Sequence, residues 1–220
     1  GSEMCIRDRV VRGSGVRAED AMTEKDKMLS GELYDANNDE ALLAERAHAK
    51  ELRYDFNQLW PSDAAGQRAI LRELLGEVGK GACVTAPFWC DYGYNIELGE
   101  NFYSNHNMVI LDCAKVKFGD NVFVAPNCGF YTAGHPVDYL RRNAGFEYAY
   151  PITVGDNVWI GGGVQVMPGV TIGSNVVIGG GSVVVKDIPS DCVAVGNPCK
   201  PIRKITDEDM KTCFDKSMNK

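Results

Sequence analysis

The sequence lacks the features that mark membrane, secreted and nucleic-acid-binding proteins. No segment approaches about 18 uninterrupted apolar residues, which a membrane-spanning helix needs, and the N-terminus has no apolar core of about 7 to 15 residues, which a secretory signal needs. The eight cysteines include no C-x-x-C pair, and 23 Lys and Arg residues are outnumbered by 30 Asp and Glu residues. We therefore expect a cytoplasmic protein with reduced thiols, with neither a membrane nor nucleic acid as a partner.

Histidine is also scarce, which bears on metal sites. The chain has three histidines, and His48 lies in a segment of helical periodicity, apart from His106 and His135. A catalytic metal held by three histidines would need all of them in one place. We therefore expect a protein that requires no metal. We interpret His48 as exposed on a helix and His106 as a turn residue.

The first third of the chain divides into a short segment and a helical region. Residues 1–21 open with Gly-Ser and show no clear period, so we interpret them as a tag or extraneous tail, with the native start at Met22. Residues 22–79 have helical periodicity and predict an N-terminal helical cap, whose first long helix begins after a cap at Asn38 or Asp39. The second helix, starting near residue 62, is expected to place on one face Ile70, Leu71, Leu74, Leu75 and Val78.

A repeat of six residues governs the rest of the chain. The aliphatic positions that follow one another at this step are Val154, Ile160, Val166, Ile172, Ile178 and Val184. An α-helix would smear this pattern, because six residues turn about 240° net around its axis. Regular hairpins are disfavoured because the segment is rich in glycine and no two-residue turns separate regular strands. The repeat predicts a parallel β-helix over residues 80–205, in which short strands stack coil upon coil.

Two segments depart from the six-residue repeat. Residues 131–153 interrupt it and contain His135; this stretch exceeds the about 12 to 15 residues beyond which a loop usually has a function. After the repeat, Thr206 and Asp209 resemble a capping box, which predicts a C-terminal helix over residues 206–220.

Several motifs together resemble one family. They are "MTEKDKMLSGELYDA", "CDYGYNIELGENFYSN", "YTAGHPVD", "PITVGDNVWIGGGVQVMPGVTIG" and "VVKDIPSDCVAVGNPCKPIRKI". From about Met22 to Arg203 the chain is similar to the hexapeptide-repeat sugar O-acetyltransferases of the maltose and galactoside type. The resemblance implies a mainly β fold, a left-handed parallel β-helix, although the general rule for parallel crossovers favours the right hand. It also implies a homotrimer with active sites between neighbouring subunits.

The same resemblance implies the reaction and its central residues. Acetyl-CoA would give its acetyl group to a hydroxyl of a sugar of the maltose, glucose or galactoside type, with His135 as general base and no acyl-enzyme. Imidazole suits this step because it is largely neutral at pH 7 yet basic enough to take the hydroxyl proton. Asn105 would donate a hydrogen bond to the developing oxyanion. Two alternatives remain: transfer to another small acceptor, serine or an amino sugar, and a non-catalytic β-helix that only binds.

Binding residues follow from the resemblance as well. The coenzyme A groove would comprise Trp159, Gly162, Gly180, Val185, Lys186, Lys200 and Arg203. The acceptor would contact Asp91, Asn105, Asp112 and Glu147, and residues 34–37 would also line its pocket. The chain departs from the family pattern at Lys200, where the family has arginine, and at Cys113 and Glu147, where the galactoside type has an acidic residue and methionine. These departures leave the identity of the sugar open.

Overall fold

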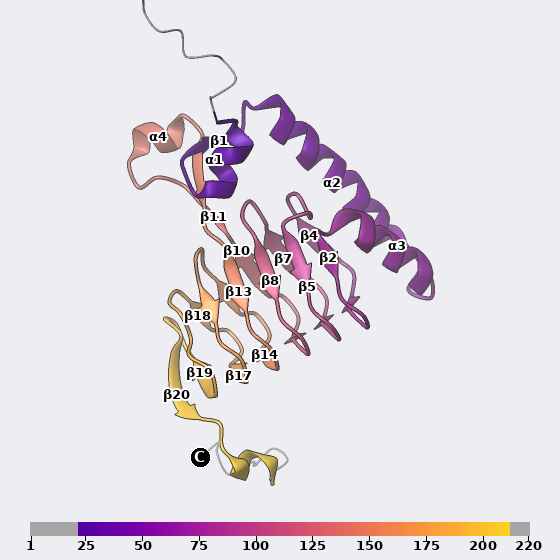
Figure 1. Ribbon diagram of the computed structural model, residues 1–220, viewed down its shortest axis with the longest axis vertical. Coiled ribbons are helices and arrows are strands. Elements are labelled where there is room, and N and C mark those ends of the chain that lie inside the picture. Colours follow the sequence, from indigo (N-terminus) through magenta and orange to yellow (C-terminus); the bar gives the residue numbers. More distant parts are fainter. Residues whose placement is uncertain (1–21, 212–220) are drawn as a thin grey trace, which may run out of the picture.

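The computed structural model describes residues 22–211 of the chain (Figure 1). Its helices are α1 (Glu24–Ser30), α2 (Glu40–Gln58), α3 (Ala64–Leu74), α4 (Tyr139–Asn143) and the short 3-10 helix η1 (Asp207–Met210). Within residues 22–211, no helix is both long enough and apolar enough to cross a bilayer.

Three parallel sheets form the sides of a β-helix. The first holds β4 (Phe88–Cys90), β7 (Met108–Leu111), β10 (Gly129–Tyr131), β15 (Gln165–Val166) and β18 (Val183–Val184). The second holds β2 (Glu77–Val78), β5 (Ile96–Leu98), β8 (Val116–Phe118), β13 (Ile152–Val154) and β16 (Thr171–Ile172). The third holds β3 (Cys83–Val84), β6 (Tyr103–Ser104), β9 (Phe123–Val124), β14 (Val158–Ile160), β17 (Val176–Ile178), β19 (Cys192–Val195) and the antiparallel β20 (Lys200–Lys204).

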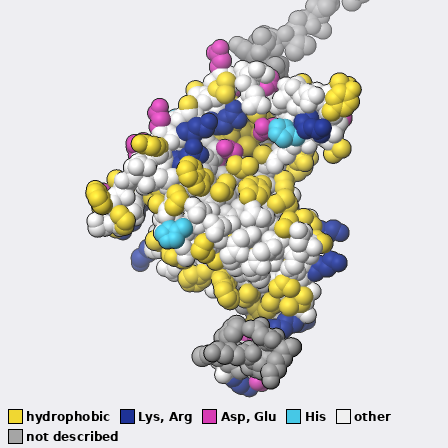
Figure 2. Space-filling model, turned by 180° about the vertical axis from the view of Figure 1, so that it is seen from behind, with side chains coloured by type: hydrophobic (Ala, Val, Ile, Leu, Met, Phe, Trp, Pro, Cys, Tyr) yellow, Lys and Arg dark blue, Asp and Glu magenta, His cyan; other side chains and the backbone are white. Residues whose placement is uncertain are grey.

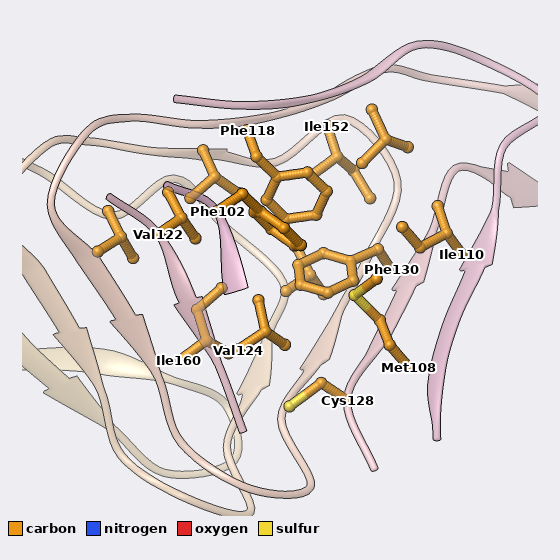
Figure 3. Packing of buried hydrophobic residues seen from close by; sticks show 14 of the residues in the cluster. Phe102, Met108, Ile110, Phe118, Val122, Val124, Cys128, Phe130, Ile152 and Ile160 are labelled. Carbon is orange, nitrogen blue, oxygen red and sulfur yellow. The ribbon is translucent and has the colours of Figure 1, made fainter. Parts of the chain in front are cut away.

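The repeat positions fill the interior of the β-helix. All six aliphatic residues counted from Val154 are buried, with exposed fractions of 0 or 1%. In the middle coils the interior is aromatic: the rings of Phe102, Phe118 and Phe130 pack in sequence, with centroids 4.9 Å apart in both pairs (Figure 3). The β-helix has the shape of a three-sided prism, with one sheet on each side. Successive residues of a strand point alternately inward and outward, so the repeat of six residues, with its inward aliphatic residue, corresponds to one side of this prism.

The helical cap begins and ends at local signals. Asp39 caps α2 by accepting a hydrogen bond from the Leu42 backbone N–H at 2.8 Å, which settles the choice between the two predicted caps. Helix α3 is capped by Asp63 and ends at Leu74. The prediction that Val78 lies on the face of this helix is wrong, because Val78 belongs to β2 and pairs with Leu98. The β-helix therefore begins at Glu77, three residues before its predicted start at residue 80.

The cap covers an open edge of the β-helix. Strand β4 is the first in its sheet, so its outward backbone groups have no neighbouring strand. Helix α2 satisfies them: the Asn57 side chain exchanges two hydrogen bonds with the Phe88 backbone at 2.9 and 3.0 Å, and Arg53 donates to the Cys90 carbonyl at 2.9 Å. In Figure 1, α2 and α3 lie across this end of the coil stack.

The interrupting segment has structure of its own. It contains β11 (Ala133–Gly134), α4 and β12 (Phe146–Ala149), and β12 pairs antiparallel with both β11 and β1 (Tyr34–Asp35). A second, smaller core of Met28, Tyr34, Ala36, Leu42, Tyr92, Cys113, Ala114 and Ala149 joins this sheet to the cap. The N-terminal residues therefore do more than close the coil: they hold the loop that carries His135.

The C-terminal prediction is met in part. The Thr206 backbone N–H donates to Asp209 at 2.9 Å, as a capping box requires, but the helix that follows is the single 3-10 turn η1. Residues 212–220 of the predicted helix lie outside the described residues, as do residues 1–21.

Candidate active site

The predicted site residues lie on two different edges of the prism. We call the edge between the third and first sheets the regular edge; its turns are residues 85–87, 105–107, 125–128, 161–164 and 179–182. We call the edge between the first and second sheets the interrupted edge; its turns are residues 91–95, 112–115, 132–151, 167–170 and 185–187. Strands β4, β7, β10, β15 and β18 separate the two edges.

Asn105 lies on the regular edge. Its side-chain oxygen accepts a hydrogen bond from the His106 backbone N–H at 2.8 Å, within its own turn. The amide nitrogen of Asn105, a hydrogen-bond donor, is not used in this contact. Beside it is a hollow of about 400 Å³ lined by Tyr103, Asn105, Phe123, Val124, Ala125 and Trp159. Asn105 thus offers a hydrogen-bond donor at the rim of an apolar hollow.

Gly162 and Gly180 continue this edge along the coil axis, and Trp159 lies beside them in the third sheet. Trp159 is 56% exposed on β14, and the two glycines occupy successive turns. A Cβ on Gly180 would lie 3.1 Å from the Gly162 carbonyl oxygen, whereas a Cβ on Gly162 would approach nothing closer than 3.5 Å. The residues form a shallow track with little side-chain bulk, which suits a long flexible ligand arm.

His135 lies on the interrupted edge, between β11 and α4. Its Nδ1 is 3.0 Å from the backbone oxygen of Phe146. A carbonyl only accepts, so Nδ1 carries the proton and Nε2 keeps a free lone pair. Nε2 is 4.0 Å from Oε1 of Glu147. The structure therefore presents a half-exposed imidazole whose one basic nitrogen is free.

Glu147 is fixed by a contact with strand β1 of the N-terminal segment. Tyr34 stands opposite Glu147 in the β1–β12 pair and donates its hydroxyl hydrogen bond to Oε2 at 2.9 Å. Burial raises the pKa of the Tyr34 hydroxyl far above its ordinary value, so the group stays a donor. Of residues 34–37, which the resemblance placed in the acceptor pocket, Tyr34 contacts Glu147 but is fully buried, so it offers no surface to an acceptor.

Asp91 and Cys113 complete this side of the edge. The Cys113 thiol is 3.8 Å from Oδ2 of Asp91. Burial raises the pKa of Asp91, and nearby Glu147 adds to that effect while Arg46 opposes it. Burial also raises the pKa of the Cys113 thiol well above its ordinary value. Cys113 is therefore a neutral group at pH 7, and the acidic character of this side comes from Asp91 and Glu147.

Asp112 occupies a different position from the one predicted. It has no exposed surface, and its Oδ1 accepts hydrogen bonds from the backbone N–H groups of Asp91 and Tyr92, both at 2.9 Å. Direct contact with an acceptor is not compatible with this burial. The carboxylate instead fixes the turn that carries Asp91. Burial raises its pKa to about 6.

The remaining predicted residues lie toward the C-terminal end. Val185 and Lys186 are exposed on the interrupted edge after β18, whereas Lys200 and Arg203 lie on β20, in the same sheet as Trp159. Arg203 forms a two-point ion pair with Asp209, at 2.8 and 2.9 Å. Lys200 has no such partner among residues 22–211. A ligand phosphate at Arg203 would compete with Asp209.

Sequence reasoning missed Arg46, which lies near the interrupted edge. The Arg46 guanidinium lies 5.9 Å from the ring centre of Tyr92. Burial raises the pKa of Asp91, and the positive charge of Arg46 opposes this rise. No motif indicated Arg46, because it lies on α2 and reaches the edge only through folding. Elsewhere His48 and His106 are exposed, in agreement with their interpretation.

Potential metal ligands are dispersed. Between residues 22 and 211, no three His, Cys, Asp or Glu side chains are grouped so that they could hold a metal ion. The residues gathered at the interrupted edge include one histidine, and their contacts are with each other and with the backbone.

Comparisons with known proteins identify the family of this chain. Residues 27–79 match the maltose acetyltransferase hexapeptide capping motif, and residues 151–186 match the bacterial transferase hexapeptide of six repeats. The structure of a maltose O-acetyltransferase from Clostridium difficile is 55% identical, with a TM-score of 0.83, and the match covers 85% of this chain and 100% of that chain. This chain belongs to the maltose and galactoside acetyltransferase family.

Further relatives support the assignment. A galactoside acetyltransferase, whose structure is in complex with coenzyme A, is 43% identical with a TM-score of 0.86, over 89% of this chain and 98% of that chain. The Saccharomyces cerevisiae protein YJL218W is 57% identical over 187 residues, 85% of this chain and 95% of that protein. Membership confirms the predicted fold, the left-handed parallel β-helix of hexapeptide-repeat acetyltransferases.

Proposed function

We propose that this acetyltransferase moves the acetyl group of acetyl-CoA to a hydroxyl of a sugar by direct transfer, with His135 as general base. The observation that carries the proposal is the fixed tautomer of His135. Its bond to the Phe146 carbonyl commits Nδ1 as donor and leaves Nε2 to accept a proton. The loop that holds it is tied to the cap, so the basic nitrogen has a set direction.

The reaction needs two proton movements and no covalent enzyme intermediate. Nε2 takes the proton of the acceptor hydroxyl as its oxygen forms a bond to the thioester carbonyl carbon. The carbonyl oxygen gains negative charge, and the Asn105 amide donates a hydrogen bond to it. When the carbon–sulfur bond breaks, the thiolate takes the proton from Nε2. The products are the acetylated sugar, coenzyme A and neutral His135.

Coenzyme A would lie along the regular edge. Its pantetheine arm fits the track of Trp159, Gly162 and Gly180, and its phosphates reach the cations of β20. The related galactoside acetyltransferase was determined with coenzyme A bound, which supports this donor. Val185 and Lys186 belong to the interrupted edge, so those of a neighbouring subunit would contact the same coenzyme A.

That separation of edges supports the homotrimer. His135 and Asn105 lie at opposite margins of one sheet, so a single chain does not bring base and oxyanion donor together. If the interrupted edge of one copy faces the regular edge of the next, the two groups converge, and a three-fold arrangement closes. Hydrophobic side chains lie exposed over the coils (Figure 2). Phe123 and Trp159 are 51% and 56% exposed, as expected of a surface that a neighbour or ligand covers.

The free cysteines favour the cytoplasm as the location of this protein. The six cysteines of residues 22–211 are all free, and five of them are buried. Reduced thiols are typical of that compartment.

Thiol release from acetyl-CoA tests the proposal. The panel contains maltose, glucose, a galactoside, an amino sugar and serine, with His135→Ala as control. Release that requires a sugar and that the substitution abolishes would support the proposal. Release only with serine or the amino sugar would change the acceptor, and coenzyme A binding without release for any acceptor would overturn the sugar assignment. Light scattering should give three times 24.0 kDa.

A further inference from the structure

The carboxylate of Glu147 stands beside the nitrogen that takes the proton in the proposed reaction. We infer that Glu147 is a positioning residue for catalysis: it stabilises the imidazolium that His135 becomes after taking the proton, and does not bind the acceptor. The inference rests on the proposed function of His135. It replaces the acceptor contact that the family resemblance predicted for Glu147.

The geometry makes this interaction depend on the proton. Nε2 of neutral His135 and Oε1 of Glu147 are both acceptors, so at 4.0 Å they form no hydrogen bond before reaction. Once Nε2 holds the hydroxyl proton, a positive ring and a negative carboxylate face each other, and they attract. An interaction that appears only as the reaction proceeds lowers the barrier without tightening substrate binding.

Glu147 is fixed for this role on its other side. Oε2 accepts the hydrogen bond of Tyr34 at 2.9 Å, and Tyr34 is fully buried. The Glu147 side chain is only 14% exposed, while that of His135 is 49% exposed. The carboxylate therefore cannot turn into solvent without leaving the Tyr34 hydroxyl, a buried donor, unpaired.

The other charged and titratable neighbours do not supply this charge. Asp91 and Cys113 face Glu147 from the turns of the β-helix, and Tyr34 faces it from β1. Cys113 and Tyr34 are neutral at pH 7. Asp91 interacts with the opposite charge of Arg46. Among residues 22–211, Glu147 is the one acidic side chain within 4.0 Å of His135.

The kinetic test compares three substitutions with sugar and acetyl-CoA varied separately. Glu147→Gln keeps the shape and the Tyr34 contact but removes the charge, and we expect kcat to fall about 3- to 10-fold with the acceptor KM within about twofold. Glu147→Asp should recover part of the loss, and Glu147→Met, the residue of the galactoside type, should resemble Gln. A raised KM with unchanged kcat would identify an acceptor contact and overturn the inference.

A double substitution shows whether the effect passes through His135. In the His135→Ala background, Glu147→Gln should change the residual rate by less than about twofold, because no imidazolium remains to stabilise. An equal loss in both backgrounds would show that Glu147 acts by another route.

A readout independent of activity separates this inference from the proposed function. The chain has three histidines, and the His135→Ala spectrum assigns the C2 proton of His135. Its titration midpoint should move to lower pH in Glu147→Gln, since the lost carboxylate disfavours the charged ring. An unmoved midpoint overturns the inference even if the enzyme is active. A moved midpoint in an enzyme inactive with every sugar would retain the pairing and reject the sugar reaction.

Discussion

The two edges of the prism are built in different ways. On the regular edge one turn repeats: Asn107 and Asn127 both have φ of 62°, in the left-handed region, and the Asn107 amide donates to Asn127 at 3.1 Å. On the interrupted edge residues 132–151 replace one turn with an inserted sheet and helix. There Tyr34 reaches a partner 113 positions away in the chain.

The difference assigns separate tasks to the edges. A repeating turn gives an even track of backbone and small side chains, which suits a long cofactor-like substrate but cannot single out one acceptor. An edge built from distant segments can gather a base and two carboxylates in one place. In the proposed homotrimer, each active site combines one edge of each kind.

The largest expected effect comes from the interrupted edge. His135→Ala should lower kcat by about 10²- to 10⁴-fold, because the hydroxyl loses its base, while coenzyme A binding measured by calorimetry stays near normal. His106→Ala, which changes an exposed histidine of the regular edge, is the matched control. A normal rate for His135→Ala would remove His135 from the mechanism.

Asn105→Ala tests the regular edge, with an expected loss in kcat of about 10²- to 10³-fold. The relation between edges can then be measured by complementation. Each variant alone should be nearly inactive, whereas in the proposed trimer, assembled at random from both variants, about one quarter of the sites pair an intact His135 with an intact Asn105 from a neighbour. Co-expressed variants should therefore recover about a quarter of the wild-type rate. No recovery would place both residues of each site in the same chain.

These edges also show what the sequence could and could not predict. The six-residue repeat predicts the coils and the buried aliphatic positions, because each residue's place depends on its near neighbours. Family motifs pointed to His135 and Asn105. The burial of Asp112, the Tyr34–Glu147 bond and the position of Arg46 depend on contacts between distant segments, which no local pattern records. Val78 was misplaced because an apolar residue just after a helix fits the helical stripe and a first strand equally well.

Asp112 provides a smaller effect within the interrupted edge. Its pKa in the folded protein is about 6, above the value of 3.8 expected for an ordinary aspartate. The folded state therefore binds the extra proton, and the stability this gives is full below about pH 4 and is lost as the pH rises through 6. Asp112→Asn has no such loss. The free energy of unfolding of Asp112→Asn relative to wild type should rise by about 2 kcal/mol between pH 4 and pH 8.

Urea unfolding at one protein concentration measures this difference. Asp156→Asn is the control: Asp156 also accepts a backbone hydrogen bond, from Asp120, but at an exposed turn. A pH-independent difference for Asp112→Asn would mean that Asp112 titrates as an ordinary carboxyl.

The smallest expected effect lies at the far end of the proposed coenzyme A track. Lys200 offers a phosphate one point charge, whereas arginine offers a planar fork that binds two oxygens at once. Lys200→Arg should therefore lower the KM for acetyl-CoA about two- to threefold and leave the acceptor KM unchanged. Lys204→Arg, on the same exposed strand, is the matched control. Equal changes for both variants would reflect overall charge on β20, whereas an effect confined to residue 200 would place a phosphate there and extend the contrast between the edges to the donor's far end.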